Sequence, residues 1–569
     1  MQKKWNVKTT DGENGRRLAG DLGVCPTTAR IMAARGIDTI EAGKQFLTPT
    51  LSTMPDPFLL KGMQAAVERV LRARKAGENV CVYGDYDVDG ISGTALLVSF
   101  MRRVGLLCDY FIPNRFDDGY GLNRESLQRI IDSGATLIIS VDCGITSLAE
   151  AAFCRTAGVD LIILDHHTPG ESIPEAAAVV NPLQPGCPYP FKMLAGVGVA
   201  FNLLVALRSR MRQEQLFGVG EEPDLREWLD LVALGTIADV VPLVGQNRTY
   251  AFFGLQRLEN SSRPGVAALK TVAGVTDTVT CGQVGFRLAP RLNAAGRMES
   301  AVPGVELLLS ASAEECSLIA GELDAANAER QAVERAILDE AIALVDGGGK
   351  YPSCKSIVLA SPVWHQGVIG IVASRIAERY HRPTIMIAIT EDGTAKGSGR
   401  SIPGFHLLEA LTACSDHLGR FGGHRYAAGV GLQAEAVAGF AVAFETASSH
   451  VLGDSELVPT LDVDCDVTPT EIDENLVHEL KRLEPFGAGN PEPTLMMCGV
   501  TIVERRIVGD GHLKLRVSAS GKVFSAIAFR QADSLTDGIL DIAFFPELNV
   551  WKNTTTLQLR IKAIRKTEV

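Results

Sequence analysis

The chain has 569 residues, which is more than one hydrophobic core can organise, so several domains are expected. Apolar residues make up 46% and charged residues 21% of it, a composition typical of globular proteins that excludes a largely disordered chain. The formal net charge of −12 argues at first against nucleic-acid binding, because phosphate binding usually leaves a basic footprint.

No run approaches the roughly 18 consecutive apolar residues of a membrane span, and residues 1–10 lack the apolar segment of a signal peptide. The 12 cysteines are scattered singly, without a CxxC pair or the dense spacing of a secreted disulfide framework. We therefore expect a cytoplasmic protein with reduced cysteines that makes no membrane contact.

The first two thirds of the chain predict helices and a parallel sheet. Residues 12–75 are expected to form a mostly helical lead-in. Short apolar runs then alternate with helical patterns over residues 79–182, which predicts a parallel, doubly wound α/β sheet. Further helices are expected at 197–211 and 225–238.

The last third predicts a connecting helix and two more domains. Residues 310–345 contain no proline and one glycine, and their apolar residues recur at near-helical spacing, so one long helix is expected to join two lobes. Strands at 356–360 and 383–389 around a helix at 368–380 predict a second α/β lobe. From about Leu461, short alternating segments predict a small β-barrel of the OB type, although turn signals alone do not separate it from other barrels.

Carboxylates follow the predicted strands of the first sheet. The acids are Asp85, Asp87 and Asp89 after the first strand, Asp142 after the next, and Asp165 with His166 and His167 after a third; Asp239 ends the helical run 225–238. In open α/β sheets, ligands bind beyond the carboxyl ends of the strands. These side chains are therefore expected to meet at one rim, which is the predicted active site.

Aspartates with a few histidines suit Mn²⁺ or Mg²⁺, and two such ions can activate water for in-line attack on a phosphoryl group. Zinc is compatible with these ligand types, but no cysteine spacing indicates a structural zinc site. Taken singly, the acids also fit a solvated turn or helix caps, and the two histidines a surface pair. Bound cations would offset the negative charge, and basic residues outnumber acidic ones over 501–569.

Four of these stretches, DYDVDG at 85–90, VDCG at 141–144, DHH at 165–167 and ADVVP at 238–242, resemble the motifs of the DHH phosphoesterase superfamily, in that order. Within it, almost the whole chain is similar to the bacterial RecJ family of single-strand DNA exonucleases. The segments that carry this likeness are IPNRFDDGYGL at 112–122, PRLNAAGR at 290–297, WHQGVIG at 364–370, GSGRS at 397–401, GGH with AAG at 422–429, and LEPFGAGNPEP at 483–493. One departure is Cys143, where relatives often carry Asn.

The resemblance implies a DHH catalytic domain with its helical lead-in over residues 1–309, a connecting helix over 310–347, a DHHA1 domain over 348–455 and an OB-fold nucleic-acid-binding domain over 456–569. It also implies two Mn²⁺ or Mg²⁺ ions held by Asp85, Asp87, Asp89, Asp142, His166, His167 and Asp239. Asp142 would bridge both ions, and Asp165 would orient a histidine or act as a further ligand. Asp142, Asp165, His166 and His167 are the expected catalytic residues.

For the substrate, the resemblance implies that Arg115, Arg291 and Arg297 contact phosphates. The glycine-rich motifs add Asn293, Ser398, Arg400, Gly423 and His424, because exposed N–H groups and an arginine fork suit phosphate. Tyr120 would stack a base or be a packed core residue, and the pair at 422–423 also fits a plain loop.

The implied activity is 5′ to 3′ degradation of single-stranded DNA to 5′-mononucleotides in recombination and repair, by a monomer that works with single-strand binding protein and a repair helicase. Two other classes share parts of the pattern. A small-molecule phosphodiesterase or pyrophosphatase of this superfamily needs no C-terminal barrel. A non-catalytic DNA-binding relative has degraded metal motifs, whereas all four are intact here.

Overall fold

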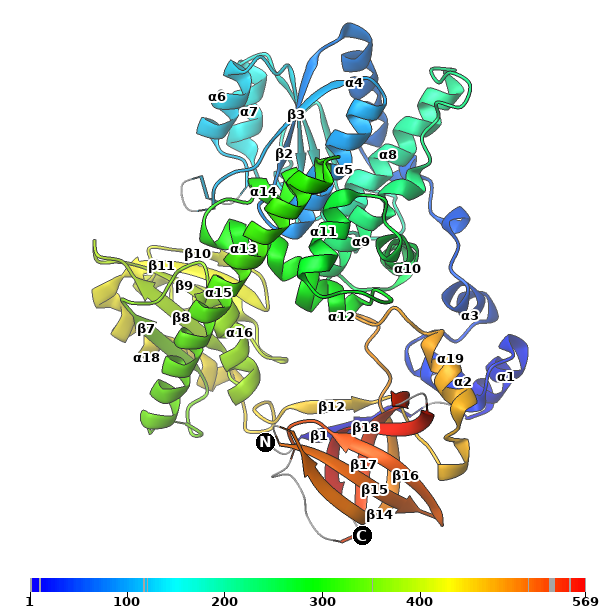
Figure 1. The fold of residues 1–569 in the computed structure, drawn as a ribbon. Coiled ribbons are helices and arrows are strands. Elements are labelled where there is room, and N and C mark those ends of the chain that lie inside the picture. Colours follow the sequence, from blue (N-terminus) through cyan, green and yellow to red (C-terminus); the bar gives the residue numbers. More distant parts are fainter. Residues whose placement is uncertain are drawn as a thin grey trace. The chain divides into compact units, whose positions relative to one another are not determined.

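The computed structural model describes residues 3–9, 12–115, 118–119, 121–349, 351–509, 511–531, 538–551 and 554–567. The chain forms two compact units, coloured along the sequence in Figure 1. The larger unit contains residues 5–296, 301–320 and 462–569, and the smaller unit is built mainly from residues 321–461.

The larger unit contains a five-stranded parallel sheet of order β3-β2-β4-β5-β6. Its strands are β2 (Asn79–Gly84), β3 (Leu107–Phe111), β4 (Leu137–Val141), β5 (Asp160–Leu164) and β6 (Ala178–Val180). This confirms the predicted parallel sheet. The chain order reverses between β2 and β4, and the crevice at such a reversal is where open α/β sheets bind ligands.

Helices cover both faces of this sheet, as Figure 1 shows. On one face lie α4 (Met63–Ala76), α5 (Val88–Arg103) and α8 (Gly196–Gln213); on the other lie α6 (Arg124–Asp132) and α7 (Leu148–Thr156). The strand β4 is buried along its whole length, which explains why its sequence is a continuous apolar run apart from Ser140. The sheet is therefore a rigid platform for the residues at its carboxyl edge.

A helical region follows the sheet. The expected helix at 225–238 is a 3-10 turn, η3 (Leu225–Trp228), continued by α9 (Leu229–Ala238). The next elements are α10 (Gly245–Glu259), α11 (Pro264–Val272), α12 (Cys281–Gln283), the π-helical turn η4 (Val284–Leu288), α13 (Ala289–Met298) and α14 (Val302–Leu309). The π-turn leads directly into α13, which carries the segment at 290–297.

A second sheet of the larger unit is the closed C-terminal barrel. Its strands are β14 (Leu495–Val508), β15 (His512–Ala519), β16 (Lys522–Ala528), β17 (Leu540–Trp551) and β18 (Thr554–Lys566), and pairing of β14 with β17 closes it. The short β13 (Cys465–Asp466) extends β14. The predicted small barrel is confirmed.

The N-terminal helices α1 (Gly12–Leu22), α2 (Pro26–Ala34) and α3 (Ile40–Leu47) contribute to the barrel's hydrophobic core, together with α19 (Glu474–Lys481). The buried side chains of Ile31 and Met32 belong to this core. The guanidinium group of Arg35 donates from Nε and Nη2 to the two carboxylate oxygens of Asp464, at 3.1 and 3.0 Å. The segment expected to lead into the first domain thus packs on the last one.

The smaller unit contains a five-stranded sheet of order β10-β11-β9-β8-β7. Its strands are β7 (Ile357–Ser361), β8 (Thr384–Ile389), β9 (Thr394–Arg400), β10 (Arg420–Gly423) and β11 (Ala427–Gln433). One face packs on α17 (Leu407–Thr412) and α18 (Val437–Val451), and the other on α16 (Ile369–Tyr380) and the C-terminal half of α15 (Ala313–Gly347). The 35-residue α15 confirms the predicted long helix.

The remaining short elements are β1 (Lys4–Val7), η1 (Leu51–Thr53), η2 (Pro57–Leu59), η5 (Ser415–His417), η6 (Ala434–Ala436), β12 (Thr460–Val463) and η7 (Pro469–Glu471). Among the described residues, none of the helices combines the length and the apolar composition that a bilayer crossing requires.

Candidate metal centre

The acids that follow the parallel strands meet at one edge of the sheet. Asp85 follows β2 and Asp142 follows β4, so these two lie on either side of the point where the strand order reverses. Asp142 has a φ of 65°, a left-handed conformation that a non-glycine residue adopts rarely and at some cost. Such strain is typical of positions where side-chain direction serves a function.

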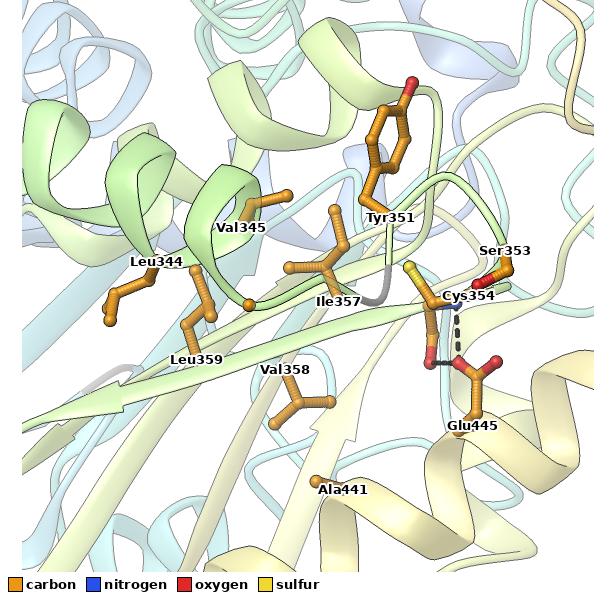
Figure 2. A pocket seen from close by; sticks show the side chains of 12 residues that line it. Leu344, Val345, Tyr351, Ser353, Cys354, Ile357, Val358, Leu359, Ala441 and Glu445 are labelled. Atoms are coloured by element: carbon orange, nitrogen blue, oxygen red, sulfur yellow. Dashed lines mark hydrogen bonds between the residues drawn. The ribbon is translucent and has the colours of Figure 1, made fainter.

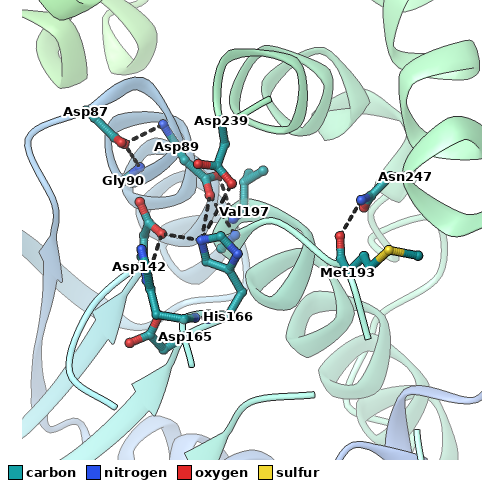
Figure 3. Close-up of polar contacts among 12 residues, drawn as sticks. Asp87, Asp89, Gly90, Asp142, Asp165, His166, Met193, Val197, Asp239 and Asn247 are labelled. Carbon is teal, nitrogen blue, oxygen red and sulfur yellow. Dashed lines mark hydrogen bonds and ion pairs between the residues drawn. The ribbon is translucent and has the colours of Figure 1, made fainter. Parts of the chain in front are cut away.

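The acids of the first motif are held in place by backbone N–H groups in the first turns of two helices. Asp87 is the N-cap of α5, and its Oδ1 accepts hydrogen bonds from the N–H groups of Asp89 and Gly90. Asp89 in turn accepts from the first turn of α8, from the N–H of Gly196 at 2.6 Å and of Val197 at 2.9 Å. The fully buried carboxyl of Asp89 is thereby held in one orientation (Figure 3).

Asp165 is occupied by hydrogen bonds within its own motif. It accepts from the N–H groups of Ile145, His166 and His167, and its Oδ1 lies 2.8 Å from Nδ1 of His167. Although burial alone would raise the pKa of Asp165, the hydrogen bond with His167 lowers it below its usual value. The contact orients the His167 ring, which is the role of a carboxylate behind a metal-binding imidazole.

His166 lies at the centre of the cluster, and Figure 3 shows it directed toward Asp142, Asp89 and Asp239. Its Nε2 is 3.1 Å from Oδ1 of Asp142, 3.6 Å from Oδ2 of Asp239 and 3.9 Å from Oδ2 of Asp89. Asp239 is the residue directly after α9. Side chains from four separate segments therefore converge here.

Three overlapping groups have ligand atoms within 4.8 Å of one another: Asp85 with Asp87 and Asp142; Asp142 with His166 and His167; and Asp89 with His166 and Asp239. Asp142 and His166 each belong to two groups, as expected when neighbouring ions share ligands.

Four buried atoms of the cluster have no hydrogen-bond partner among the described residues: Oδ1 of Asp85, Oδ1 of Asp142, Nε2 of His166 and Oδ2 of Asp239. A buried polar atom without a partner costs about 1–3 kcal/mol. Divalent cations would satisfy all four, and the oxygen-rich set with imidazole suits Mn²⁺ or Mg²⁺. The residues present therefore fit the ions.

The electrostatics agree with this fit. Burial, reinforced by neighbouring aspartates, raises the pKa of Asp85, Asp142 and Asp239 well above the usual range and the pKa of Asp89 to about 7. Burial and the neighbouring His167 lower the pKa of His166 to about 4, so its imidazole is neutral and able to coordinate at neutral pH. The protein alone disfavours this many ionised acids, whereas bound cations favour them.

Two glycines allow the close approach of these acids, and sequence reasoning missed both. A Cβ at Gly196 would lie 2.8 Å from Cβ of Asp142, and a Cβ at Gly235 would lie 2.7 Å from Oδ1 of Asp89. The available signal was the small-residue run AGVG at 195–198 at the start of an apolar helix.

The residues expected to bind phosphate in the PRLNAAGR segment make intramolecular contacts. Oδ1 of Asn293 accepts from the N–H of Val88, which places it behind the first motif. Arg291 donates to the carbonyls of Arg287 and Val272, and Arg297 donates to the carbonyl of Gly367 at 3.4 Å. Arg115 lies with its guanidinium 5.2 Å from the ring centre of Tyr86. Tyr120 lies outside the described residues.

The other expected phosphate residues form a group in the smaller unit. Nη1 of Arg400 donates to Oγ of Ser398 at 3.2 Å, and both side chains lie against the first turn of α16, beside Gly370. Gly423, with a φ of 142°, and His424 form the β10–β11 turn, where the N–H of His424 donates to the carbonyl of Ala427. A Cβ at Gly423 would lie 2.5 Å from Cα of Ala428, so this turn requires glycine.

The parallel sheet with its converging acids defines a phosphoesterase of the DHH class, and family models agree. The model of the DHH family N-terminal domain matches residues 79–236, that of the DHHA1 domain residues 355–447, and that of the RecJ OB domain residues 463–563.

Curated relatives narrow the class. The chain is 38% identical to the single-stranded-DNA-specific exonuclease RecJ of Bacillus subtilis, over 98% of this chain and 70% of the relative, and 38% identical to that of Escherichia coli, over 95% and 96%. The crystal structure of RecJ from Thermus thermophilus in complex with Mn²⁺ matches with a TM-score of 0.86 at 33% identity, covering 100% of this chain and 80% of that one. Its Mg²⁺ complex matches with a TM-score of 0.80. The chain belongs to the RecJ family.

A cavity of about 500 Å³ also lies within the smaller unit, between the C-terminal end of α15, β7 and α18 (Figure 2). Most of its lining is apolar, and the carboxylate of Glu445 already accepts from the N–H groups of Lys355 and Ser356 and from Oγ of Ser356. The carboxylate of Glu445 is therefore already hydrogen-bonded within the fold.

Proposed function

We propose that this chain is a single-stranded-DNA-specific exonuclease that hydrolyses phosphodiester bonds with two divalent cations, Mn²⁺ or Mg²⁺. The observation that carries the proposal is the set of overlapping ligand groups that share Asp142 and His166 and contain four buried atoms without partners in the described part of the chain. The curated relatives, whose names state this activity, supply the substrate class.

Bound cations would supply Lewis-acid stabilisation of the phosphoryl charge and activation of the attacking water. The chain's own residues position the site. The α8 amides fix Asp89, and Asp165 holds the His167 ring through Nδ1. Asp142 stands where two ligand groups meet, which suits a bridging role. Asn293 supports the start of α5 rather than reaching outward with Oδ1.

In this proposal Ser398, Arg400, Gly423 and His424 bind phosphate of the strand. The support is the Arg400 guanidinium beside the first turn of α16, since a helix N-terminus and an arginine both favour an anion. Replacing Arg400 by Ala should weaken substrate binding while metal occupancy is retained. Loss of the metal instead would refute the phosphate role.

The proposal includes a 5′ to 3′ direction with release of 5′-mononucleotides, a monomeric state, a cytoplasmic location, and cooperation with single-strand binding protein and a repair helicase. These features rest on the family resemblance.

The deciding experiment is digestion of 5′- and 3′-labelled single and double strands with Mn²⁺, Mg²⁺ or chelator. We expect the 5′-labelled single strand to release labelled mononucleotide first, the duplex to resist, and Asp142→Ala to abolish cleavage. Cleavage by Asp142→Ala in Mn²⁺ would refute the assigned chemistry. Faster turnover of pyrophosphate or a dinucleotide than of long strands would indicate a small-molecule phosphodiesterase instead.

A further inference from the structure

The sheet of the smaller unit has one face that is only partly covered by helices. Residues directly opposite one another on paired strands share a face, so three cross-strand rows can be assigned from the register. The first row is Arg420, Gly431 and Lys396; the second is Gly422, Gly429 and Ser398; the third contains Ala427 and Arg400. The helix α16 packs on this face over β8 and β9.

The glycines of this sheet fall into two kinds. A Cβ at Gly397 would lie 2.5 Å from the Val430 side chain, and a Cβ at Gly399 would lie 2.6 Å from the Ile385 side chain. Both would enter the buried face of the sheet, where the core leaves no room for a side chain. Among the residues that the structure describes, a Cβ at Gly422 would meet nothing within 4 Å, and a Cβ at Gly429 would meet only the carbonyl oxygen of Gly397 at 3.9 Å. Both residues are exposed, and neither has a positive φ.

Neither packing nor backbone conformation therefore requires glycine at 422 and 429. Glycine inside a strand weakens it, and an unexplained strand glycine often marks a place where a ligand or another backbone approaches closely. The exposed surface formed by Gly422 on β10 and Gly429 on β11, here called the glycine strip, has the form of such a place.

The first cross-strand row, next to the glycine strip, contains two basic residues. Lys396 and Arg420 stand on either side of Gly431, and the stem of Arg420 lies over that glycine, with its Nε 2.8 Å from where a Cβ would be. Within the described part of the chain, neither cationic side chain makes a hydrogen bond or an ion pair. Both line a hollow of about 520 Å³, to which Asp416 contributes a carboxylate.

Lys396 is four residues from Arg400 on β9, a distance of about 13 Å along an extended strand. The Arg400 guanidinium is held at its own end of the strand, where Nη1 donates to Oγ of Ser398 and to the carbonyl of Gly399, so Lys396 and Arg420 are placed to contact a different phosphate. We infer that the glycine strip carries the backbone of single-stranded DNA, with Lys396 and Arg420 forming a second phosphate subsite beyond the one at Ser398 and Arg400. The inference rests on the proposed function for its substrate class.

The test measures binding of a hydrolysis-resistant phosphorothioate single strand to the Mn²⁺-loaded full chain at several salt concentrations. Lys396→Gln and Arg420→Gln should each weaken binding several-fold. The double variant should reduce the slope of log K against log salt by about 0.7, the value for one lost phosphate contact on a single strand. Asp416→Asn should tighten binding. Arg335→Gln, at an exposed arginine on α15, is the matched control.

The strip itself is tested by Gly429→Val. Valine suits a strand and enters open space, so Tm should stay the same or rise, while DNA binding should weaken because the side chain stands in the path of the strand. Gly397→Val should instead lower Tm, because its side chain would collide with Val430.

Unchanged binding and salt slope in the Lys396 and Arg420 variants would overturn the inference, and so would unchanged binding by Gly429→Val. Either result leaves the proposed function standing as long as wild type degrades single strands and Asp142→Ala does not. A wild-type protein that fails to bind or degrade single strands would refute the proposed function itself.

Discussion

Oδ1 of Asp142 lies 3.1 Å from Nε2 of His166, and neither atom has a hydrogen-bond partner among the described residues. The two residues follow neighbouring parallel strands, β4 and β5, so the sheet brings them together. A neutral imidazole and the carboxyl group of Asp142 that face each other in this way are arranged to hold a cation between them once the carboxyl group is ionised.

Replacing Asp142 by Asn keeps the shape of the side chain and removes its charge. We expect Mn²⁺ affinity to fall by more than about 100-fold, since even residues behind the ligands contribute 10–100-fold. Calorimetric titration with Mn²⁺ measures this. Asp230→Asn is the matched control, because Asp230 is equally buried but pairs with Arg263 outside the site; it should lower stability without changing metal affinity.

Replacing Asp165 by Asn should lower metal affinity by about 10–100-fold, because His167 loses the negative charge behind its ring and the amide keeps only one of the two acceptor oxygens that the carboxylate offers to His167 and Ile145. The pKa of His167, which the Asp165 contact raises despite burial, should fall toward or below its usual value. NMR titration of the imidazole in the metal-free protein checks this second effect. An unchanged His167 pKa would mean that Asp165 has no orienting role.

Metal-free stability should fall as pH rises, because four buried acids with raised pKa values, represented by Asp89, outweigh the opposite contribution of His166, whose pKa is lowered to about 4. The pKa of Asp89 rises from an ordinary value of 3.8 to about 7 on folding, chiefly through burial and then through Asp87. The folded state therefore binds the proton more tightly, and the contribution to the free energy of unfolding is lost as pH rises from about 4 to about 7, by a few kcal/mol. Unfolding in urea with chelator, at a series of pH values, measures the loss.

Added Mn²⁺ should reverse this trend, because cations favour the ionised acids. At a hundredfold excess over Kd, each bound ion adds about 2.7 kcal/mol to the free energy of unfolding. Asp89→Asn should flatten the metal-free pH dependence. A metal-free protein that gains stability over this pH range would contradict the account of the buried acids.

Gly196→Ala should disturb the site without removing any ligand. The added methyl would lie within 3 Å of three atoms of Asp142, and such overpacking costs about 1–3 kcal/mol. We expect both lower Tm and weaker Mn²⁺ binding. Gly198→Ala, in the same turn of α8, is the control: its nearest neighbour is the flexible Leu194 side chain at 3.3 Å, so both measurements should change little.

The N-terminal helices should stabilise the barrel. Ile31→Ala empties a fully buried position in the barrel's core and should cost about 2–5 kcal/mol. Hydrogen exchange of the β14–β18 amides should become faster, while exchange in the parallel sheet should not. Equal exchange in the barrel strands of variant and wild type would show that these helices are not part of its cooperative unit.

The strand-end acids could be predicted because a parallel sheet follows from local pattern, and its topology brings the carboxyl ends of neighbouring strands together. The contacts that position these acids could not be predicted from the sequence. The amides of Gly196 and Val197 hold Asp89 from more than 100 residues away, and Asn293 reaches Val88 across 205. Such contacts depend on how helices pack in three dimensions, which periodicity does not encode.

The two histidines show the same limit. Adjacency in the sequence gives no reason for their pKa values to differ, but burial lowers the pKa of His166 to about 4, whereas Asp165 raises that of His167 despite burial. The packing of α2 on a barrel more than 400 residues later was likewise beyond local reasoning, since the Arg35–Asp464 pair joins segments with no shared pattern.

The central claim is that one acidic cluster holds a pair of cations through Asp142. Counting bound Mn²⁺ by electron paramagnetic resonance, in wild type and in Asp142→Asn, tests it most directly. The account predicts two bound ions per chain in wild type, coupled to each other magnetically, and loss of that coupling with at most one ion in the variant. Two ions in both proteins, or a single uncoupled ion in wild type, would contradict it.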